Sequence, residues 1–183
     1  MINVLGIAGS LRKGSYNKAL LKAAVELQPD NMKLEIFDIA GIPLYNGDIE
    51  SEGTPTAVNA FKNKIAEADA LLIVTPEYNY SIPGVLKNAI DWASRPPASS
   101  PLNQKPLGIM GASSGLMGTV RAQMHLRQTA VLTNMYTMNR PEVLVTKAHE
   151  KFDKEGKLTD ENTAQHIRKF LSALAEWATK FKN

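Results

Sequence analysis

The amino-acid sequence predicts an α/β protein built on a parallel, doubly wound sheet, and three observations indicate this class. Short apolar runs alternate along the chain with segments whose apolar residues recur at helical spacing. The runs are unbroken, as expected of parallel strands that are buried on both faces. The main runs also end in loops rich in Gly, Ser, Pro or Asn, which are the residues that interrupt regular structure.

Length and composition limit the possible functions. The chain has 183 residues, of which 44% are hydrophobic and 21% charged, so we expect a single globular domain over residues 1–183. Its net charge of +3 is spread without a basic arm, which argues against nucleic acid as a partner. No segment has the length of a membrane-spanning helix, and no signal pattern opens the sequence. The absence of cysteine excludes disulfides, thiolate zinc sites and a thiol nucleophile, and we expect a cytoplasmic protein with no membrane partner.

The N-terminal elements are predicted from their periodicity. Residues 2–8 form an apolar run, the first predicted strand, and a helical stripe follows that ends before a proline. Residues 33–38 alternate between apolar and polar side chains, as an edge strand does. Residues 39–54 are predicted to form a long loop, and Thr54 to cap the next helix, with Pro55 at its first helical position.

The central and C-terminal elements continue the alternation. Residues 70–74 are all apolar and predict the central strand, and the helical pattern behind it begins near Val85. The other expected elements, in order, are a surface loop over 95–106, a strand over 107–112, a helix over 119–132, a short strand within 134–145 interrupted by Pro141, and a final amphipathic helix capped by Thr159.

These elements match a flavodoxin-like doubly wound sandwich. That fold has a parallel sheet of about five strands in the order 2-1-3-4-5, with helices on both faces. In this order the strands that end near Ala8, Thr75 and Ala112 are neighbours. Ligands of open α/β sheets bind outside the carboxyl ends of the strands. The loops that follow these strands are therefore expected to form one site.

The loop after the first strand, residues 9–17, has the composition of an anion site. It precedes a helix, whose N-terminal N–H groups and dipole favour a bound phosphate. Ser10, Ser15 and Asn17 would add side-chain donors, and Arg12 a charge-assisted hydrogen bond. The glycine spacing fits neither a Walker loop nor the dinucleotide-binding fingerprint. The alternative is that Ser15 or Asn17 is an ordinary helix cap.

The loop after the central strand, residues 76–84, reads Pro-Glu-Tyr-Asn-Tyr-Ser-Ile-Pro-Gly. Its prolines restrict the backbone, and Gly84 allows a turn or close packing where the next helix starts. Tyr78 and Tyr80 supply flat surfaces, and Asn79 supplies an amide group. A stiff loop with these groups suits a planar ring with polar edges, although both tyrosines would also serve as packing residues.

The loop after the next strand contains Gly-Ala-Ser-Ser-Gly at residues 111–115 and admits two interpretations. It matches the G-x-S-x-G pattern of α/β-hydrolases, with Ser113 as the nucleophile. The available partners are His125, His149 or His166 as the base and Asp153 or Asp160 to orient it. The pattern is short and frequent by chance, so we favour the interpretation in which Ser113, Ser114 and Gly115 present hydroxyl and N–H groups to the edge of a ring. The histidines are scattered, so no metal site is expected.

Taken together, the three loops resemble those of the NADPH-dependent FMN reductase family, whose members include chromate reductases, quinone reductases and azoreductases. The resemblance rests on residues 9–17, on residues 76–84 with Leu-Lys-Asn-Ala-Ile-Asp-Trp at 86–92, and on the Ser-Ser-Gly of 113–115. It covers nearly the whole chain, and the second motif is the most specific. It implies a flavoprotein oxidoreductase with FMN as its cofactor and NADPH or NADH as the co-substrate.

The same resemblance implies a mechanism and a set of cofactor contacts. NAD(P)H would give a hydride to N5 of the flavin, and a quinone, an azo compound, chromate or free flavin would then be reduced in ping-pong order, with no catalytic side chain. The implied cofactor-binding residues are Ser10, Arg12, Ser15, Tyr16 and Asn17 in the first loop, Pro76, Glu77, Tyr78, Asn79, Ser81 and Ile82 in the second, and Ser113, Ser114 and Gly115 in the third.

The resemblance also implies an assembly, a homodimer or a homotetramer. Arg121 and Glu142 match positions that join subunits in parts of the family, whereas Met124 stands where a tyrosine is expected. The alternative function is that of an FMN-binding electron carrier that does not oxidise NAD(P)H. Carriers generally need a charged docking face, and a net charge of +3 spread over the surface gives little sign of one.

Overall fold

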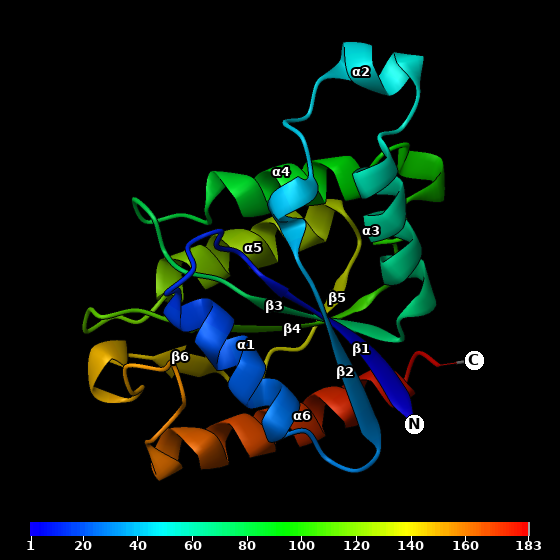
Figure 1. The fold of residues 1–183 in the computed structure, drawn as a ribbon. Coiled ribbons are helices and arrows are strands. Elements are labelled where there is room, and N and C mark those ends of the chain that lie inside the picture. Colours follow the sequence, from blue (N-terminus) through cyan, green and yellow to red (C-terminus); the bar gives the residue numbers. More distant parts are fainter. Residues whose placement is uncertain (183) are drawn as a thin grey trace.

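The sheet of the computed structural model, which describes residues 1–182, has the strand order that the sequence predicts (Figure 1). Its strands run parallel in the order β2-β1-β3-β4-β5, and β6 also pairs with β4. The flavodoxin-like fold class is therefore confirmed. The strands are β1 (Ile2–Ala8), β2 (Met32–Phe37), β3 (Ala70–Val74), β4 (Pro106–Ala112), β5 (Tyr136–Thr137) and β6 (Val143–Val145).

Helices cover both faces of the sheet. α1 and α6 pack on one face, and α3, α4 and α5 pack on the other (Figure 1). No helix within residues 1–182 combines the length and the apolar character needed to cross a membrane. The helices are α1 (Tyr16–Glu26), α2 (Gly47–Glu52), α3 (Thr56–Glu67), α4 (Gly84–Ala93), α5 (Val120–Leu132) and α6 (Glu161–Thr179), with the short turns η1 (Ile39–Gly41), η2 (Pro97–Ser99) and η3 (Ala148–Glu150).

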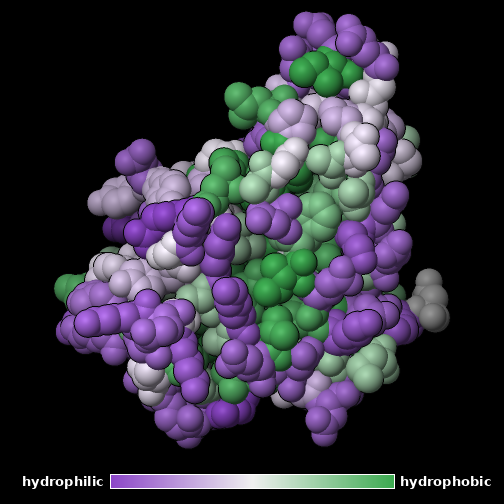
Figure 2. Space-filling model, in the orientation of Figure 1, coloured by the Kyte–Doolittle hydropathy of each residue, from purple (hydrophilic) through white to green (hydrophobic). Residues whose placement is uncertain are grey.

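The alternation of side chains along each strand divides the core into two layers. In β3, Ala70, Leu72 and Val74 pack toward α1 and α6, whereas Leu71 and Ile73 pack toward α3, α4 and α5. None of these side chains is more than 1% exposed, which explains the unbroken apolar run. The edge strand β2 is less well covered: Ile36 is 44% exposed, and Figure 2 shows hydrophobic side chains gathered over this strand.

Two short strands occupy the fifth position of the sheet. β5 pairs with the start of β4, and β6 pairs with its end. The residues between them include Pro141, which cannot donate a hydrogen bond to a neighbouring strand. The strand predicted within 134–145 is therefore found in its expected place, but it is split in two.

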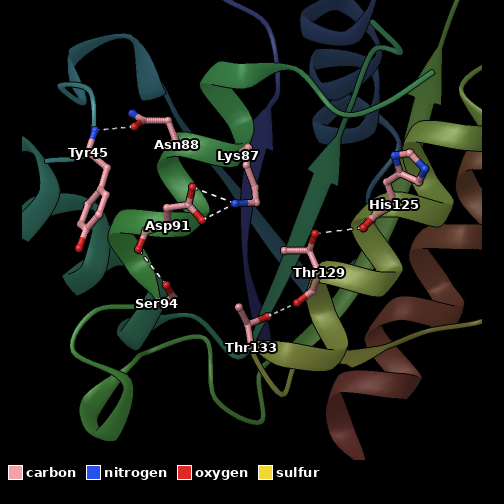
Figure 3. A network of polar contacts seen from close by, with 8 residues as sticks. All are labelled: Tyr45, Lys87, Asn88, Asp91, Ser94, His125, Thr129 and Thr133. Atoms are coloured by element: carbon pink, nitrogen blue, oxygen red, sulfur yellow. Dashed lines mark hydrogen bonds and ion pairs between the residues drawn. The ribbon is translucent and has the colours of Figure 1, made fainter. Parts of the chain in front are cut away.

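The predicted loop over residues 39–54 contains η1 and α2, which the sequence pattern did not indicate. α2 projects from the body of the molecule (Figure 1), and because none of its side chains is buried it leaves no periodic signal. The segment that leads into α2 is hydrogen-bonded to α4 through residues 43–45. Asn88 accepts a hydrogen bond from the N–H of Tyr45 (Figure 3), and Asn88 and Trp92 both donate to the carbonyl of Pro43.

The starts of α3 and α6 differ from the prediction in their capping residues. Pro55, not Thr54, occupies the N-cap position of α3, and it makes no side-chain hydrogen bond there. Asp160, not Thr159, caps α6, and its Oδ2 accepts a hydrogen bond of 2.7 Å from the N–H of Thr163. Hydrogen bonds from Thr163 hold the pKa of Asp160 below its usual value. Both errors are of one residue, because the backbone conformation decides which of two adjacent candidates becomes the cap.

Candidate functional site

The three loops that were predicted to form one site meet at one rim of the sheet. The N–H of Gly9 donates to the carbonyl of Val74, and the N–H of Thr75 donates to the carbonyl of Met110, so the strand ends are held side by side. A cavity of about 290 Å³ lies between the loops, near the lower end of the usual size of small-molecule pockets. It is lined by Ser10, Arg12, Ser15, Tyr16, Asn17, Pro76, Glu77, Tyr78, Ala112 and Ser113. We call it the rim cavity.

The first loop presents hydrogen-bond donors and positive charge to the rim cavity. Ser15 caps α1, because its Oγ accepts from the N–H groups of Asn17 and Lys18. Within the described residues, the N–H groups of Gly14 and Ser15 meet no acceptor, and the first turn of α1 carries no acidic side chain. The exposed Arg12 guanidinium donates to the carbonyl of Gly14 at 2.6 Å. Free N–H groups, a helix N-terminus and a guanidinium together favour an anion, above all a phosphate.

Asn17 joins the first loop to the third. Its side chain is 2% exposed. The amide Nδ2 donates to the carbonyl of Ala112, and Oδ1 accepts from the N–H of Ala112, each at 2.9 Å. Both polar groups of the side chain are thus engaged, and they fix the spacing between the start of α1 and the end of β4.

The second loop is a tight hairpin turn. The N–H of Tyr78 donates to the carbonyl of Ser81 and the N–H of Ser81 to the carbonyl of Tyr78, both at 2.9 Å. Between them, Asn79 and Tyr80 have φ angles of 50° and 65°, as in a type I′ turn. This conformation suits asparagine, whereas tyrosine adopts it only where the surroundings enforce it. The turn keeps Tyr78 and Tyr80 at the rim, 50% and 65% exposed.

Glu77 and Arg121 hold this turn against α5. Glu77 Oε2 accepts from the N–H groups of Arg121 at 2.9 Å and Ala122 at 3.1 Å. The side chain of the N-cap residue Thr119 does not cap these N–H groups. The Arg121 guanidinium lies 3.6 Å from Glu77 Oε1 and 4.0 Å from the centroid of the Tyr80 ring, a cation–π contact. From the sequence, only a subunit contact was expected of Arg121. Its bond to Glu77 was not predicted, because the two residues lie 44 positions apart and no local pattern connects them.

We expect the Glu77→Ala variant to unfold at a temperature about 2–4 °C below that of the parent protein. Helix α5 loses the acceptor at its N-terminus, and the loss of such a cap costs about 1 kcal/mol. Differential scanning calorimetry measures the change, with Glu26→Ala, an exposed helical glutamate, as the matched control. Equal melting temperatures for all three proteins would show that α5 does not depend on the Glu77 carboxylate.

The geometry does not support the hydrolase alternative. Ser113 Oγ accepts from the N–H of Gly115 at 3.1 Å, and no histidine within residues 1–182 is hydrogen-bonded to it. The possible bases are engaged or placed elsewhere: His125 is paired with Ser81, His149 with Glu150, and His166 lines a separate cavity beside Arg140. Asp153 and Asp160 accept hydrogen bonds from N–H groups of their own turns. In the same described range, no group of three or more His, Asp or Glu side chains is placed to hold a metal ion.

Several predicted residues of the second and third loops lie outside the wall of the rim cavity. Asn79 is at the tip of the turn, Ser81 is paired with His125 at 2.9 Å, and Ile82 packs against the core under α4. Ser114 and Gly115 continue the third loop beyond the cavity wall.

Ala112 lines the rim cavity but was not predicted to do so. An alanine at the end of a strand has no distinguishing chemistry, and its role follows only from the two hydrogen bonds to Asn17. The parallel strand order could indicate which loops meet, but it could not indicate which backbone groups they share.

The fold and the site define a flavodoxin-like protein with an anion-binding loop beside an aromatic turn. Residues 2–150 match the NADPH-dependent FMN reductase family. The chain is 52% identical over 181 residues to an NAD(P)H-dependent FMN reductase of Pseudomonas aeruginosa, covering 99% of this chain and 97% of that protein. It is 41% identical over 184 residues to a quinone reductase of Escherichia coli K12, covering 99% and 97%. The solved structure of FerB, a flavoenzyme NAD(P)H:(acceptor) oxidoreductase of Paracoccus denitrificans, has 35% identity and a TM-score of 0.90 over 98% of both chains.

The protein therefore belongs to the NADPH-dependent FMN reductase family. It is an oxidoreductase with FMN as its cofactor and NAD(P)H as its electron donor. The family resemblance seen in the three loops of the sequence is thereby confirmed.

Proposed function

We propose that this protein reduces quinones with electrons from NAD(P)H, using FMN held in the rim cavity. The observation that carries the proposal is the meeting of a donor-rich helix N-terminus and a rigid tyrosine turn in one cavity. The quinone reductases among the relatives support the choice of acceptor. Azo compounds, chromate and free flavin are further acceptors that we propose by analogy with the wider family. The donor is a metabolite of the cytoplasm, where we expect the protein to act.

The chemistry of the rim fits the two ends of FMN. The N–H groups of Gly14 and Ser15, the Ser10 hydroxyl and the Arg12 guanidinium would hold the phosphate. Asn17 would position this loop through its bonds to Ala112. The ring would lie along the second loop, bordered by Pro76, Glu77, Tyr78, Asn79, Ser81 and Ile82, with Ser113, Ser114 and Gly115 near its other edge.

FMN, when bound, supplies the two-electron chemistry between NAD(P)H and the acceptor. The residues of this chain bind and orient the reactants. Within residues 1–182 the N–H groups of Asn79, Tyr80 and Ser114 meet no protein acceptor, so they are free to stabilise negative charge at the polar edge of the ring. Because Tyr78 and Tyr80 lie at an exposed rim, donor and acceptor would use the same face in turn, which gives ping-pong kinetics.

Anaerobic mixing of the FMN-loaded protein with NADPH tests this function. Rapid loss of the yellow colour, reversed by addition of a quinone, is the expected result. A yellow protein that NADPH leaves unchanged would indicate the electron carrier instead. Initial rates at several fixed quinone concentrations test the ping-pong order, which predicts parallel double-reciprocal lines.

We expect the Arg12→Ala variant to bind FMN about ten- to a hundredfold more weakly, because this is the loss of affinity that follows from removing one hydrogen bond to a charged group. Quenching of FMN fluorescence measures the dissociation constant, with Arg168→Ala, an exposed arginine of α6, as the control. The rate of bleaching by NADPH in FMN-saturated variant protein should stay within about threefold of the parent rate, because Arg12 serves the phosphate end. A variant that binds FMN normally but bleaches slowly would contradict the assigned role.

We also propose that the protein forms a homodimer or a homotetramer. Large apolar side chains are exposed on α5: Met124 is 57%, Val131 81% and Leu132 90% exposed, as at many subunit interfaces. Within one chain, Arg121 is bound to Glu77 and Glu142 to Arg140, so a subunit contact through them would add to existing bonds. Sedimentation equilibrium of the parent protein and of Leu132→Glu tests this assembly.

A further inference from the structure

Beside the rim cavity lies a second cavity of about 330 Å³, and we propose that it receives the 2′-phosphate of NADPH and makes the protein prefer NADPH to NADH. The inference rests on the proposed function, in which the donor binds at the rim. The second cavity lies between the first turns of α1 and residues 153–156, and we call it the lysine cavity. It shares Arg12, Ser15 and Tyr16 with the rim cavity. The two cavities are therefore neighbours on either side of the first loop, and a ligand that extends from the rim over this loop would reach the second cavity.

The outer wall of the lysine cavity is a small hairpin that its own hydrogen bonds hold in place. The N–H of Asp153 donates to the carbonyl of Lys157 at 3.0 Å, and Asp153 Oδ1 accepts from the N–H groups of Glu155 and Lys157 at 3.1 and 2.7 Å. The ring of Phe152, at the base of the hairpin, lies 5.9 Å from the ring of Tyr16 at the start of α1. The cavity is thus bounded by two tethered elements, and the carboxylate of Asp153 is already engaged by its own turn.

The lining of this cavity has an excess of positive charge. Its basic side chains are Arg12, Lys13, Lys18, Lys22 and Lys154, against the carboxylates of Asp153 and Glu155. None of these basic side chains forms an ion pair within residues 1–182. Figure 2 shows that the surface over the start of α1 and the segment after β6 is hydrophilic.

This excess is greater than the FMN phosphate requires. That phosphate has Arg12 and the N–H groups of the first loop, which leaves the lysines of α1 and the hairpin without a partner. Lys18 and Lys22 also lie four residues apart on one helix, where like charges repel each other. A bound anion removes this repulsion, so the arrangement is explained by a second anion site.

The chemistry of the donor indicates which anion this is. NADPH differs from NADH only in a phosphate monoester on the adenosine ribose, which carries about −1.5 to −2 charges at neutral pH. With the nicotinamide at the aromatic turn, the adenosine half can lie back along the first loop, toward the lysine cavity. Lysines bind a phosphate as flexible point charges and need no fixed geometry. NADH offers this cavity no group to bind, so the lysines discriminate between the two donors.

The test compares the double variant Lys22→Ala/Lys154→Ala with the double variant Lys33→Ala/Lys169→Ala, which removes the same charge from exposed positions elsewhere. Calorimetric titration of the FMN-loaded proteins with 2′,5′-ADP and with 5′-ADP measures the affinity of the lysine cavity for each nucleotide, without any turnover. We expect the first variant to bind 2′,5′-ADP about tenfold more weakly than the parent. Its affinity for 5′-ADP should change less than about twofold, since that ligand lacks the 2′-phosphate. The kcat/KM for NADPH should fall in parallel, and that for NADH should not.

Other outcomes would overturn the 2′-phosphate site, and they can be told apart from a failure of the proposed function. If NADPH bleaches the parent protein but 2′,5′-ADP binds no more tightly than 5′-ADP, the proposed function stands and the 2′-phosphate site is refuted. Equal losses for both nucleotides, or equal losses in the two double variants, would indicate general electrostatic attraction only. A matching loss of FMN affinity would assign the lysine cavity to the cofactor phosphate. Absence of bleaching by either donor would instead refute the proposed function.

Discussion

The Asn17→Leu variant is expected to lose about 2–6 kcal/mol of the free energy of unfolding, because each buried polar group left without a partner costs about 1–3 kcal/mol. The N–H and the carbonyl of Ala112 both depend on the Asn17 side chain, at 2.9 Å. Leucine has a similar size and keeps water from reaching them. The first and third loops then lose their connection, and FMN affinity should fall together with stability.

Urea unfolding and FMN fluorescence titration measure the two effects of this substitution. Asn59→Leu is the matched control, because Asn59 is an exposed helical residue that makes one side-chain hydrogen bond, to the carbonyl of Thr54. Its stability should change by less than about 0.5 kcal/mol, as is usual at the surface. If both variants proved equally stable, the Asn17 bridge would not be what joins the loops.

The Gly111→Ala variant is expected to lose about 3 kcal/mol or more of the free energy of unfolding, or to fail to accumulate as folded protein. A Cβ atom at Gly111 would overlap Oγ1 of Thr119 and lie 2.5 Å from the carbonyl oxygen of Thr75. Thr119 is fully buried at the start of α5, and the Thr75 carbonyl belongs to the backbone that follows β3. Relief of the overlap would therefore displace the start of α5 and push the end of β3 away from β4, with which it is paired. Those strands carry the second and third loops.

Gly84→Ala is the comparison for this prediction. It lies at the start of α4, where an added Cβ would meet nothing within 4 Å, and alanine favours a helix. We expect this variant to be at least as stable as the parent in thermal unfolding. A Gly111→Ala protein with the same melting temperature would mean that β3 and β4 can move apart at the rim without consequence.

Much of the fold could be predicted because its signals are local. The run over residues 70–74 is apolar throughout, since both faces of β3 are covered by helices. Once the strands were placed, the doubly wound order brought the three rim loops together. The strand predicted within 134–145 is present, but its division into β5 and β6 was not predicted, and neither was α2. These segments are too short to show periodicity, and tertiary pairing decides their structure.

The residues that line the rim cavity were predicted except for Ala112, but the hydrogen bonds between them were not. Asn17 and Ala112 are 95 positions apart, and Glu77 and Arg121 are 44 apart, so no local pattern connects them. The sequence correctly indicated polar side chains at strand ends. It could not show that Asn17 and Glu77 use theirs mainly to hold the loops in position, because that depends on which backbone groups lie opposite in the folded chain.

The central claim is that the N-terminus of α1 and the loops after β3 and β4 bind FMN together. A crystal structure of the FMN complex tests it most directly. The expected result places the phosphate against Arg12 and the N–H groups of Gly14 and Ser15, with the ring between the Tyr78 turn and Ser113. Density for FMN at any other place on the chain, with this rim empty, would contradict the claim.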